Sequence, residues 1–196
     1  MIDTKTISVY DARDEDYAKL NEKLYELPEL EEFAVQLPAG GRVLDLGCGP
    51  GQYAGKLAAW GYEVDATDAS AKMVARAASH SGVTAWQARF DELDVVGVYD
   101  GVWANFSLLH IRKAELPGVL ARIRRAGKPG MTLHVAVKLG EGEGPDAIGR
   151  FYAYYGANEL TGLLQEAGFS IVTRRFGEGA GLSGETAKHV SMLCRG

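Results

Sequence analysis

The segment VLDLGCGPG at residues 43–51 constrains the fold of this chain more than any other part of the sequence. Its apolar start is typical of a buried strand, and a helix-like segment, 52–60, follows it directly. Between the two, Gly47, Gly49 and Gly51 let the backbone approach a ligand more closely than a Cβ would permit. The pattern predicts a strand, a turn that binds a nucleotide-like ligand, and a helix.

The rest of the sequence alternates strand-like and helix-like segments. Strands are expected at 42–46, 62–68, 83–88, 99–105 and 133–137, with helices between them. This alternation is typical of a parallel sheet with helices on both faces. Two further strands, 169–176 and 188–194, are close enough in sequence to pair antiparallel. We therefore expect an α/β fold with a seven-stranded, mostly parallel sheet and an antiparallel C-terminal strand.

The length of 196 residues fits one domain. Helical spacing over 13–36, in two pieces divided at Pro28, predicts an N-terminal cap or lid within 1–40. The ligand-binding core is expected at 41–137. Residues 138–196 begin with a glycine-rich and aromatic segment without a regular pattern, and continue with a helix and a hairpin.

Composition excludes several classes of protein. No apolar run approaches the roughly 18 residues of a membrane span, and the N-terminus lacks the pattern of a secretory signal, so we expect a soluble cytoplasmic protein without a membrane partner. The net charge of −5 argues against a nucleic-acid partner. Cys48 and Cys194 are far apart and have no metal-ligand spacing with the four histidines, so no metal site is predicted. Both a monomer and a homodimer remain open.

Several polar residues are expected at the carboxyl ends of the strands, where ligands bind in such sheets. Asp68 ends the second strand, residues 89–91 follow the third, and Asn105 ends the fourth. A carboxylate at the position of Asp68 is suited to accept both hydroxyls of a ribose. The alternative is that Asp68 only supplies a negative charge at the start of the next helix, which Ser70 is expected to cap.

Two classes of cofactor are compatible with this layout. A dinucleotide site requires the spacing G-x-G-x-x-G, which differs from the spacing here. In addition, Asp45 lies two residues before the first glycine, where an acid repels a pyrophosphate but suits a ligand with an ammonium group and no phosphate. S-adenosylmethionine is such a ligand.

The chain resembles the class I S-adenosylmethionine-dependent methyltransferases over essentially its full length. The resemblance rests on VLDLGCGPG at 43–51, on YEVDATDAS at 62–70 and on YDGVWANFSLLH at 99–110. It is most similar to small bacterial members that carry K-x-G-E-x-E-G, here Lys138 to Gly144, and an Arg-Phe-Tyr segment, here 150–152. This resemblance implies a Rossmann-like fold, S-adenosylmethionine as the cofactor and S-adenosylhomocysteine as the product.

The resemblance also implies roles for individual residues. The three glycines pass beside the cofactor, Asp45 lies near its amino group, Asp68 holds the ribose hydroxyls and Met73 packs near the adenine. Many members have an acid after the third strand that accepts from the adenine amino group, but the matching residue here is Arg89. Phe90 is then expected to contribute through its backbone and ring, with Asp91 or Glu92 as alternatives. Asn105 borders the sulfonium.

His110 is the candidate general base, because it follows the turn that faces the cofactor and titrates near neutrality. The alternative is a hydrogen-bonded packing histidine.

On the acceptor side, Lys138 and Arg150 are candidates to bind an anionic small molecule, and Tyr152 is a candidate to form a wall of the site. Glu141 and Glu143 instead favour a cationic acceptor. Tyr10 and Tyr17 are candidates for the lid or for ordinary helix packing.

The sequence therefore predicts a methyltransferase that acts on a small-molecule acceptor. Two alternatives stay open: a module that binds S-adenosylmethionine without catalysis, and an NAD-dependent dehydrogenase, which the glycine spacing and Asp45 disfavour.

Overall fold

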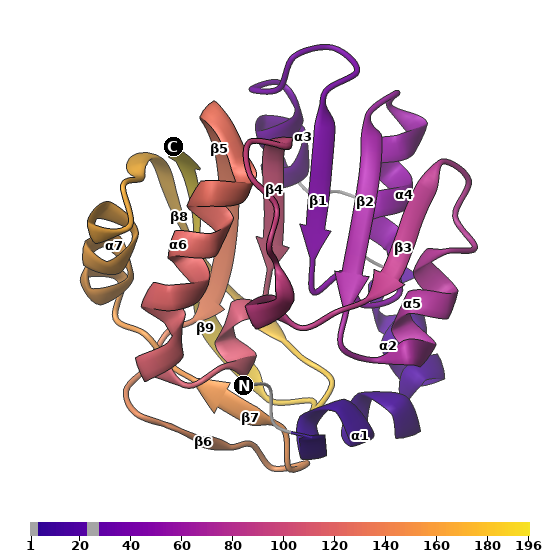
Figure 1. The fold of residues 1–196 in the computed structure, drawn as a ribbon. Coiled ribbons are helices and arrows are strands. Elements are labelled where there is room, and N and C mark those ends of the chain that lie inside the picture. Colours follow the sequence, from indigo (N-terminus) through magenta and orange to yellow (C-terminus); the bar gives the residue numbers. More distant parts are fainter. Residues whose placement is uncertain (1–3, 23–27) are drawn as a thin grey trace.

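The computed structural model describes residues 4–22 and 28–196. Its centre is a seven-stranded sheet in the order β3-β2-β1-β4-β5-β9-β8 (Figure 1). The strands are β1 (Arg42–Leu46), β2 (Glu63–Asp68), β3 (Val83–Gln87), β4 (Tyr99–Asn105), β5 (Gly127–Lys138), β8 (Ser170–Ala180) and β9 (Thr186–Arg195). The first five are parallel, and β9 runs antiparallel to both of its neighbours. The predicted fold class is confirmed.

Helices cover both faces of this sheet because the strands bury side chains on both sides. On one face, α6 (Leu116–Ala126) and α7 (Ala157–Glu166) pack on a core that includes Leu44, Val102 and Leu133. On the other face, α3 (Pro28–Ala34), α4 (Gln52–Ala59) and α5 (Ala71–Ala77) pack on a core around Val43 and Trp103. Buried polar residues at the carboxyl ends of the strands lie between these two cores.

Local signals set the ends of several helices. The hydroxyl of Ser70 accepts a hydrogen bond from the backbone N–H of Met73 at 3.1 Å and so caps α5, as its position predicted. Pro117 occupies the first turn of α6, where its missing N–H costs nothing. Pro28 opens α3, so the break that it caused in the helical pattern is a helix start.

The N-terminal segment forms two helices, α1 (Thr4–Ala12) and α2 (Asp14–Glu22). The sequence did not predict α1, because its residues lack a strong apolar stripe. Residues 23–27 of the predicted helical segment 13–36, Leu24 among them, lie outside the described residues. In Figure 1, α1 crosses below the carboxyl ends of β1 and β2. This places it over the turn that contains the three glycines.

Near the C-terminus, the predicted antiparallel pair of strands is present with longer strands than expected, and one further sheet was not predicted. The segment without a regular pattern contains a small antiparallel sheet of β6 (Glu143–Pro145) and β7 (Phe151–Ala153). The strands β8 and β9 pair over Ser170 to Arg195 and extend past the main sheet as a hairpin arm. Both segments lie at the same end of the sheet as the glycine turn (Figure 1).

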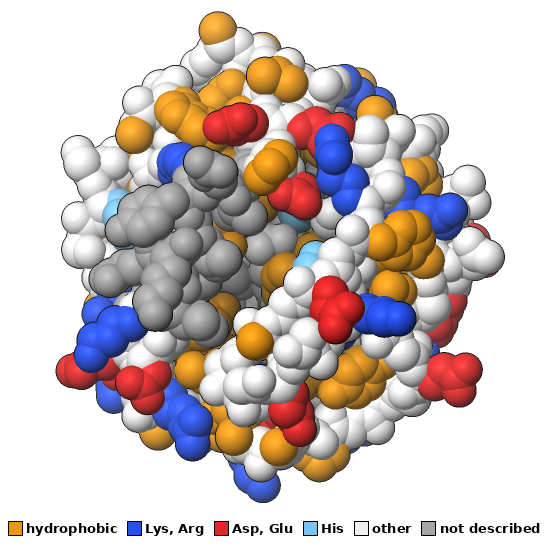
Figure 2. Space-filling view, turned by 180° about the vertical axis from the view of Figure 1, so that it is seen from behind, with side chains coloured by type: hydrophobic (Ala, Val, Ile, Leu, Met, Phe, Trp, Pro, Cys, Tyr) orange, Lys and Arg blue, Asp and Glu red, His pale blue; other side chains and the backbone are white. Residues whose placement is uncertain are grey.

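No described helix is both long and apolar enough for a membrane span. On the face opposite to that of Figure 1, acidic and basic side chains of the described residues are interspersed (Figure 2).

Candidate functional site

The three glycines of the turn have different tasks. All have a positive φ, namely 74° at Gly47, 53° at Gly49 and 81° at Gly51. A Cβ at Gly51 would lie 2.6 Å from the Cα of Ala77, so this glycine lets α5 approach the turn. A Cβ at Gly47 would lie 2.4 Å from the Cβ of Ser107. Gly47 and Gly49 line a cavity, whereas Gly51 serves helix packing.

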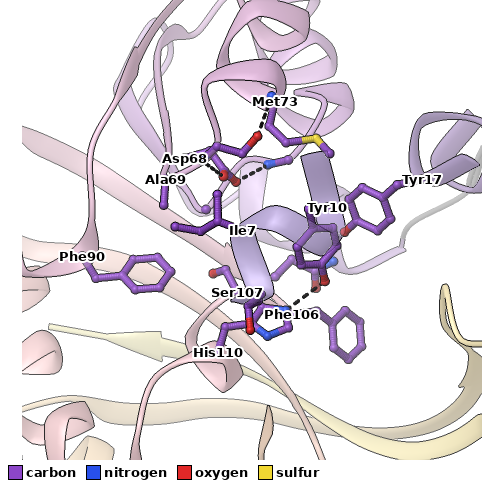
Figure 3. A pocket seen from close by; sticks show the side chains of 15 residues that line it. Ile7, Tyr10, Tyr17, Asp68, Ala69, Met73, Phe90, Phe106, Ser107 and His110 are labelled. Carbon is purple, nitrogen blue, oxygen red and sulfur yellow. Dashed lines mark hydrogen bonds between the residues drawn. The ribbon is translucent and has the colours of Figure 1, made fainter. Parts of the chain in front are cut away.

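We call this cavity the turn cavity. It lies between the glycine turn, the carboxyl ends of β2 and β4, and α1 (Figure 3). Its walls are Thr6, Ile7, Tyr10, Tyr17, Gly47, Gly49, Asp68, Ala69, Ser70, Met73, Phe90, Asn105, Phe106, Ser107 and His110. The resemblance placed many of these residues around one cofactor, and the fold brings them together.

Asp68 is fixed in the wall of the turn cavity by two backbone donors. Its Oδ2 accepts from the N–H of Gly49 at 3.0 Å, and its Oδ1 accepts from the N–H of Ser70 at 2.8 Å. Burial raises the pKa of Asp68, while these two hydrogen bonds lower it. Each carboxylate oxygen keeps a second lone pair for a ligand hydroxyl.

Asp45 lies beneath the turn, and its side chain does not line the turn cavity. The residue is 1% exposed and accepts a hydrogen bond from the backbone N–H of Ala54. Its Oδ2 has no hydrogen-bond partner among the described residues, and burial raises its pKa to about 8. A buried, unpaired carboxylate oxygen favours a nearby cation. The ammonium group of S-adenosylmethionine fits this requirement.

Asn105 is held at the end of β4 by two side chains. Its Nδ2 donates to the hydroxyl of Tyr53 at 3.3 Å, and its Oδ1 accepts from Nε2 of His134 at 3.1 Å. Burial lowers the pKa of His134 to about 3, and the neutral ring stacks on Trp103 with a centroid distance of 3.7 Å. The hydrogen bonds to Tyr53 and His134 therefore fix the orientation of the Asn105 amide.

The next two residues belong to the site but were missed from the sequence. Phe106 has a φ of 53° and is the one described non-glycine residue with a positive φ. Such a conformation costs about 1–3 kcal/mol and is often found at functional sites. Ser107 lines the turn cavity, and its buried Oγ has no partner among the described residues. Their position directly after β4 was the signal available in the sequence.

His110 uses both ring nitrogens for hydrogen bonds. It lies in the short 3-10 helix η2 (Leu108–His110), and its Nδ1 is 2.7 Å from the carbonyl oxygen of Phe151, so Nδ1 carries the hydrogen. Its Nε2 then accepts from the hydroxyl of Tyr10 at 2.9 Å (Figure 3). Burial lowers its pKa to about 4. In this arrangement, the geometry favours the packing alternative over a general base.

Arg150 is already paired. Its guanidinium forms a buried ion pair with Asp146 at 2.7 Å and donates to the hydroxyl of Tyr10 at 3.0 Å. The residue is 1% exposed. This pairing leaves little capacity to bind an anionic ligand, so Arg150 mainly orders the segment between β6 and β7 and ties it to α1.

A second cavity, which we call the hairpin cavity, adjoins the turn cavity and has a volume of about 330 Å³. Lys138, Arg150 and Tyr152 line it, together with the arm of β8 and β9. Four residues line both cavities, namely Tyr10, Tyr17, Asn105 and Phe106. A ligand in one cavity therefore meets a ligand in the other at these four side chains.

Arg89 lies outside both cavities. Its guanidinium forms an ion pair with Asp91 at 2.9 Å, and its backbone N–H donates to Glu92. Phe90 lies in the short 3-10 helix η1 (Phe90–Glu92) and is 6% exposed; its ring lies beside Gly47 and lines the turn cavity. After β3, it is therefore Phe90, and not Arg89, that lines the turn cavity.

Comparison with known proteins finds a family match for part of the chain. Residues 43–130 match a family model described as a methyltransferase domain. No curated protein sequence matches the chain.

Solved structures share the fold. An S-adenosylmethionine-dependent methyltransferase from Methanosarcina mazei has a TM-score of 0.76 at 17% identity, over 88% of this chain and 98% of that chain. The 1,6-didemethyltoxoflavin-N1-methyltransferase of Burkholderia thailandensis, solved with 1,6-didemethyltoxoflavin and S-adenosylhomocysteine, has a TM-score of 0.71 at 22% identity, over 96% and 87%. The [4+2]-cyclase SpnF has a TM-score of 0.65 at 22% identity, over 85% and 79%.

These matches confirm the predicted recognition. Residues 43–130 match a methyltransferase domain, and the chain has the fold of solved S-adenosylmethionine-dependent methyltransferases.

Proposed function

We propose that this protein transfers a methyl group from S-adenosylmethionine to a small-molecule acceptor. The observation that carries the proposal is the pair of adjoining cavities, one on the glycine turn and one beside it, with Tyr10, Tyr17, Asn105 and Phe106 in the walls of both. Two substrates that exchange a methyl group require such neighbouring sites with a narrow common region.

The turn cavity fits the cofactor in its polar and apolar parts. Asp68 offers carboxylate oxygens for the ribose hydroxyls. Asp45 lies beneath the turn and outside the walls of the cavity, and its buried, unpaired Oδ2 favours an ammonium group bound against the turn. Met73 and Phe90 are buried and line the same cavity, where they provide apolar surface for the adenine. When bound, S-adenosylmethionine supplies a methyl carbon attached to a positively charged sulfur.

The chain contributes mainly position and exclusion of water. Asn105 is fixed by Tyr53 and His134, so its amide meets the ligands in one orientation. Thr6 and Tyr10 of α1 line the cavity. Their hydrogen bonds, from the backbone N–H of Phe151 to Thr6 and from the Tyr10 hydroxyl to His110, hold α1 in place over it. Preorganised alignment of two reactants and a closed site supply much of the rate enhancement in a direct displacement.

Two observations support a small molecule as the acceptor. The hairpin cavity, at about 330 Å³, is in the size range of roughly 300–1,000 Å³ for small-molecule sites. In addition, the Burkholderia thailandensis relative is titled as an N1-methyltransferase with 1,6-didemethyltoxoflavin bound.

An acceptor screen tests this proposal. The protein is incubated with S-adenosylmethionine and pools of phenols, amines, thiols and nitrogen heterocycles, and S-adenosylhomocysteine is quantified. We expect turnover with at least one pool and none with the Asp68→Ala variant.

The same fold in a [4+2]-cyclase makes a role without methyl transfer the second candidate. Tight binding of S-adenosylhomocysteine without turnover in any pool would favour that candidate.

A further inference from the structure

The ammonium group of Lys138 lies inside the hairpin cavity. Its Nζ is 4.3 Å from the centroid of the Tyr152 ring, and 3.7 Å from the position that a Cβ at Gly181 would occupy. Tyr152 and Gly181 both line the cavity, one in β7 and one at the turn of the hairpin arm. The end of β5 therefore places a cation close to both of these segments.

The positive charge of Lys138 in this cavity is not neutralised by an ion pair with any described residue. No ion pair of the described residues includes it, whereas the guanidinium of Arg150 is taken by Asp146. Burial and the neighbouring Arg150 lower the pKa of Lys138, against a smaller rise from the charges of Asp146 and Glu185. Two carboxylates also line the cavity, but Glu178 is exposed and Glu29 is half-buried. A ligand oxyanion beside Lys138 would therefore give this side chain the ion-pair partner that it lacks among the described residues.

The walls around this cation are aromatic. Phe106 and His189 meet edge to face with centroids 5.2 Å apart, and Trp103 and Tyr152 line the same space. The left-handed backbone of Phe106 holds its ring at the junction with the turn cavity. Flat side chains of this kind bind flat ligands by stacking or by edge contacts.

Neither His110 nor Tyr10 offers a free base at the junction. The Nε2 of His110 accepts from Tyr10, and burial raises the pKa of the Tyr10 hydroxyl, which keeps it protonated. An acceptor that is already ionised needs no base from the protein.

We infer that the acceptor is a planar aromatic compound with an acidic hydroxyl group, which Lys138 binds as the oxyanion. This inference rests on the proposed function, because it assigns the acceptor of that reaction. The hydroxyl proton leaves to water before transfer. An oxygen–carbon bond then forms to the methyl carbon while the carbon–sulfur bond breaks, and its electron pair stays on sulfur. The products are an aryl methyl ether and a neutral thioether.

The test uses 4-nitrophenol, whose ionised form has its own absorption band. The probe is titrated with pH in the presence of saturating S-adenosylhomocysteine and the full chain. An opposite charge within a few ångströms lowers a pKa by about 1–3 units, so the bound probe is expected to ionise at least about one pH unit lower than the free probe. Lys138→Arg should keep this shift, and Lys138→Met should abolish it.

Lys188→Met is the matched control, because Lys188 is exposed on β9 and does not line the cavity. Circular dichroism of each variant verifies folding. If Lys138→Met shifts the probe as much as the unchanged protein does, or if an aromatic amine binds and 4-nitrophenol does not, the inference is wrong. These results leave the proposed function intact as long as S-adenosylhomocysteine binds. Failure of S-adenosylhomocysteine to bind would instead overturn the proposed function.

Discussion

The hydroxyl of Tyr10 donates to Nε2 of His110 at 2.9 Å, although the two residues are 100 positions apart in the chain. The same hydroxyl accepts from the guanidinium of Arg150 at 3.0 Å. This one atom therefore ties α1 to the turn after β4 and to the segment between β6 and β7. Cofactor entry past α1 must break or displace these contacts.

Tyr10→Phe should destabilise the protein, because it leaves a donor of Arg150 and an acceptor of His110 without a partner in a buried site. The expected loss is about 1–3 kcal/mol, measured as the free energy of unfolding in urea. Tyr154→Phe is the control, since that ring stacks on Tyr152 and lies closer to solvent. Equal losses in the two variants would show that the Tyr10 hydroxyl does not carry this connection.

His110 should make stability depend on pH on the acidic side. Its folded pKa of about 4 lies below the ordinary value of 6.5, so the unfolded chain binds a proton that the folded protein excludes. The free energy of unfolding should therefore fall as the pH drops from about 6.5 to about 4, by up to about 3 kcal/mol. His110→Gln should flatten this part of the curve relative to the unchanged protein. A parallel curve would mean that His110 is accessible to protons.

Asp45 should make the free energy of unfolding fall as the pH rises, which is opposite to the effect of His110. Its folded pKa of about 8 lies above the ordinary value of 3.8, so the folded protein holds a proton that the unfolded chain releases, and the stability from this proton is lost as the pH rises from about 4 to about 8. Asp45→Asn should raise the stability at pH 8 by about 1–3 kcal/mol. The same variant should bind S-adenosylhomocysteine at least about tenfold more weakly, because a carboxamide cannot ionise beside the ammonium group as the Asp45 carboxyl group can. Unchanged affinity in calorimetry would remove Asp45 from the site.

Asp68→Asn should weaken nucleoside binding. A hydrogen bond to a charged group contributes about 1.5–3 kcal/mol, so the dissociation constant of S-adenosylhomocysteine should rise about 10- to 150-fold. Asp91→Asn is the control, because Asp91 pairs with Arg89 and does not line the turn cavity. A larger effect of Asp91→Asn would move polar recognition of the cofactor to the segment after β3.

Much of the fold could be predicted because its signals are local. The strand at 42–46, the glycine turn and the cap at Ser70 depend on neighbouring residues, and the structure has them at the predicted positions. Helix α1 could not be predicted from periodicity, because its buried Thr6 is polar and is satisfied by the backbone N–H of Phe151, a contact 145 positions away.

In the candidate site too, some residues could be predicted from local sequence, whereas others depend on contacts between distant parts of the chain. Asp68 and Asn105 follow from their places at strand ends. The pairing of Arg150 with Asp146 and the engagement of both nitrogens of His110 depend on how the segment 141–157 folds back on α1, and no local pattern encodes this. The conformation of Phe106 is likewise set by its surroundings, since nothing in the residue type predicts a positive φ.

The central claim, that the turn cavity is a site for S-adenosylmethionine, is tested most directly by isothermal titration calorimetry. The unchanged protein is titrated separately with S-adenosylmethionine, S-adenosylhomocysteine and NAD. We predict one saturable site per chain for each sulfur ligand, with a weaker dissociation constant in Asp68→Asn, and no saturable binding of NAD. Saturable binding of NAD together with no binding of either sulfur ligand would contradict the claim.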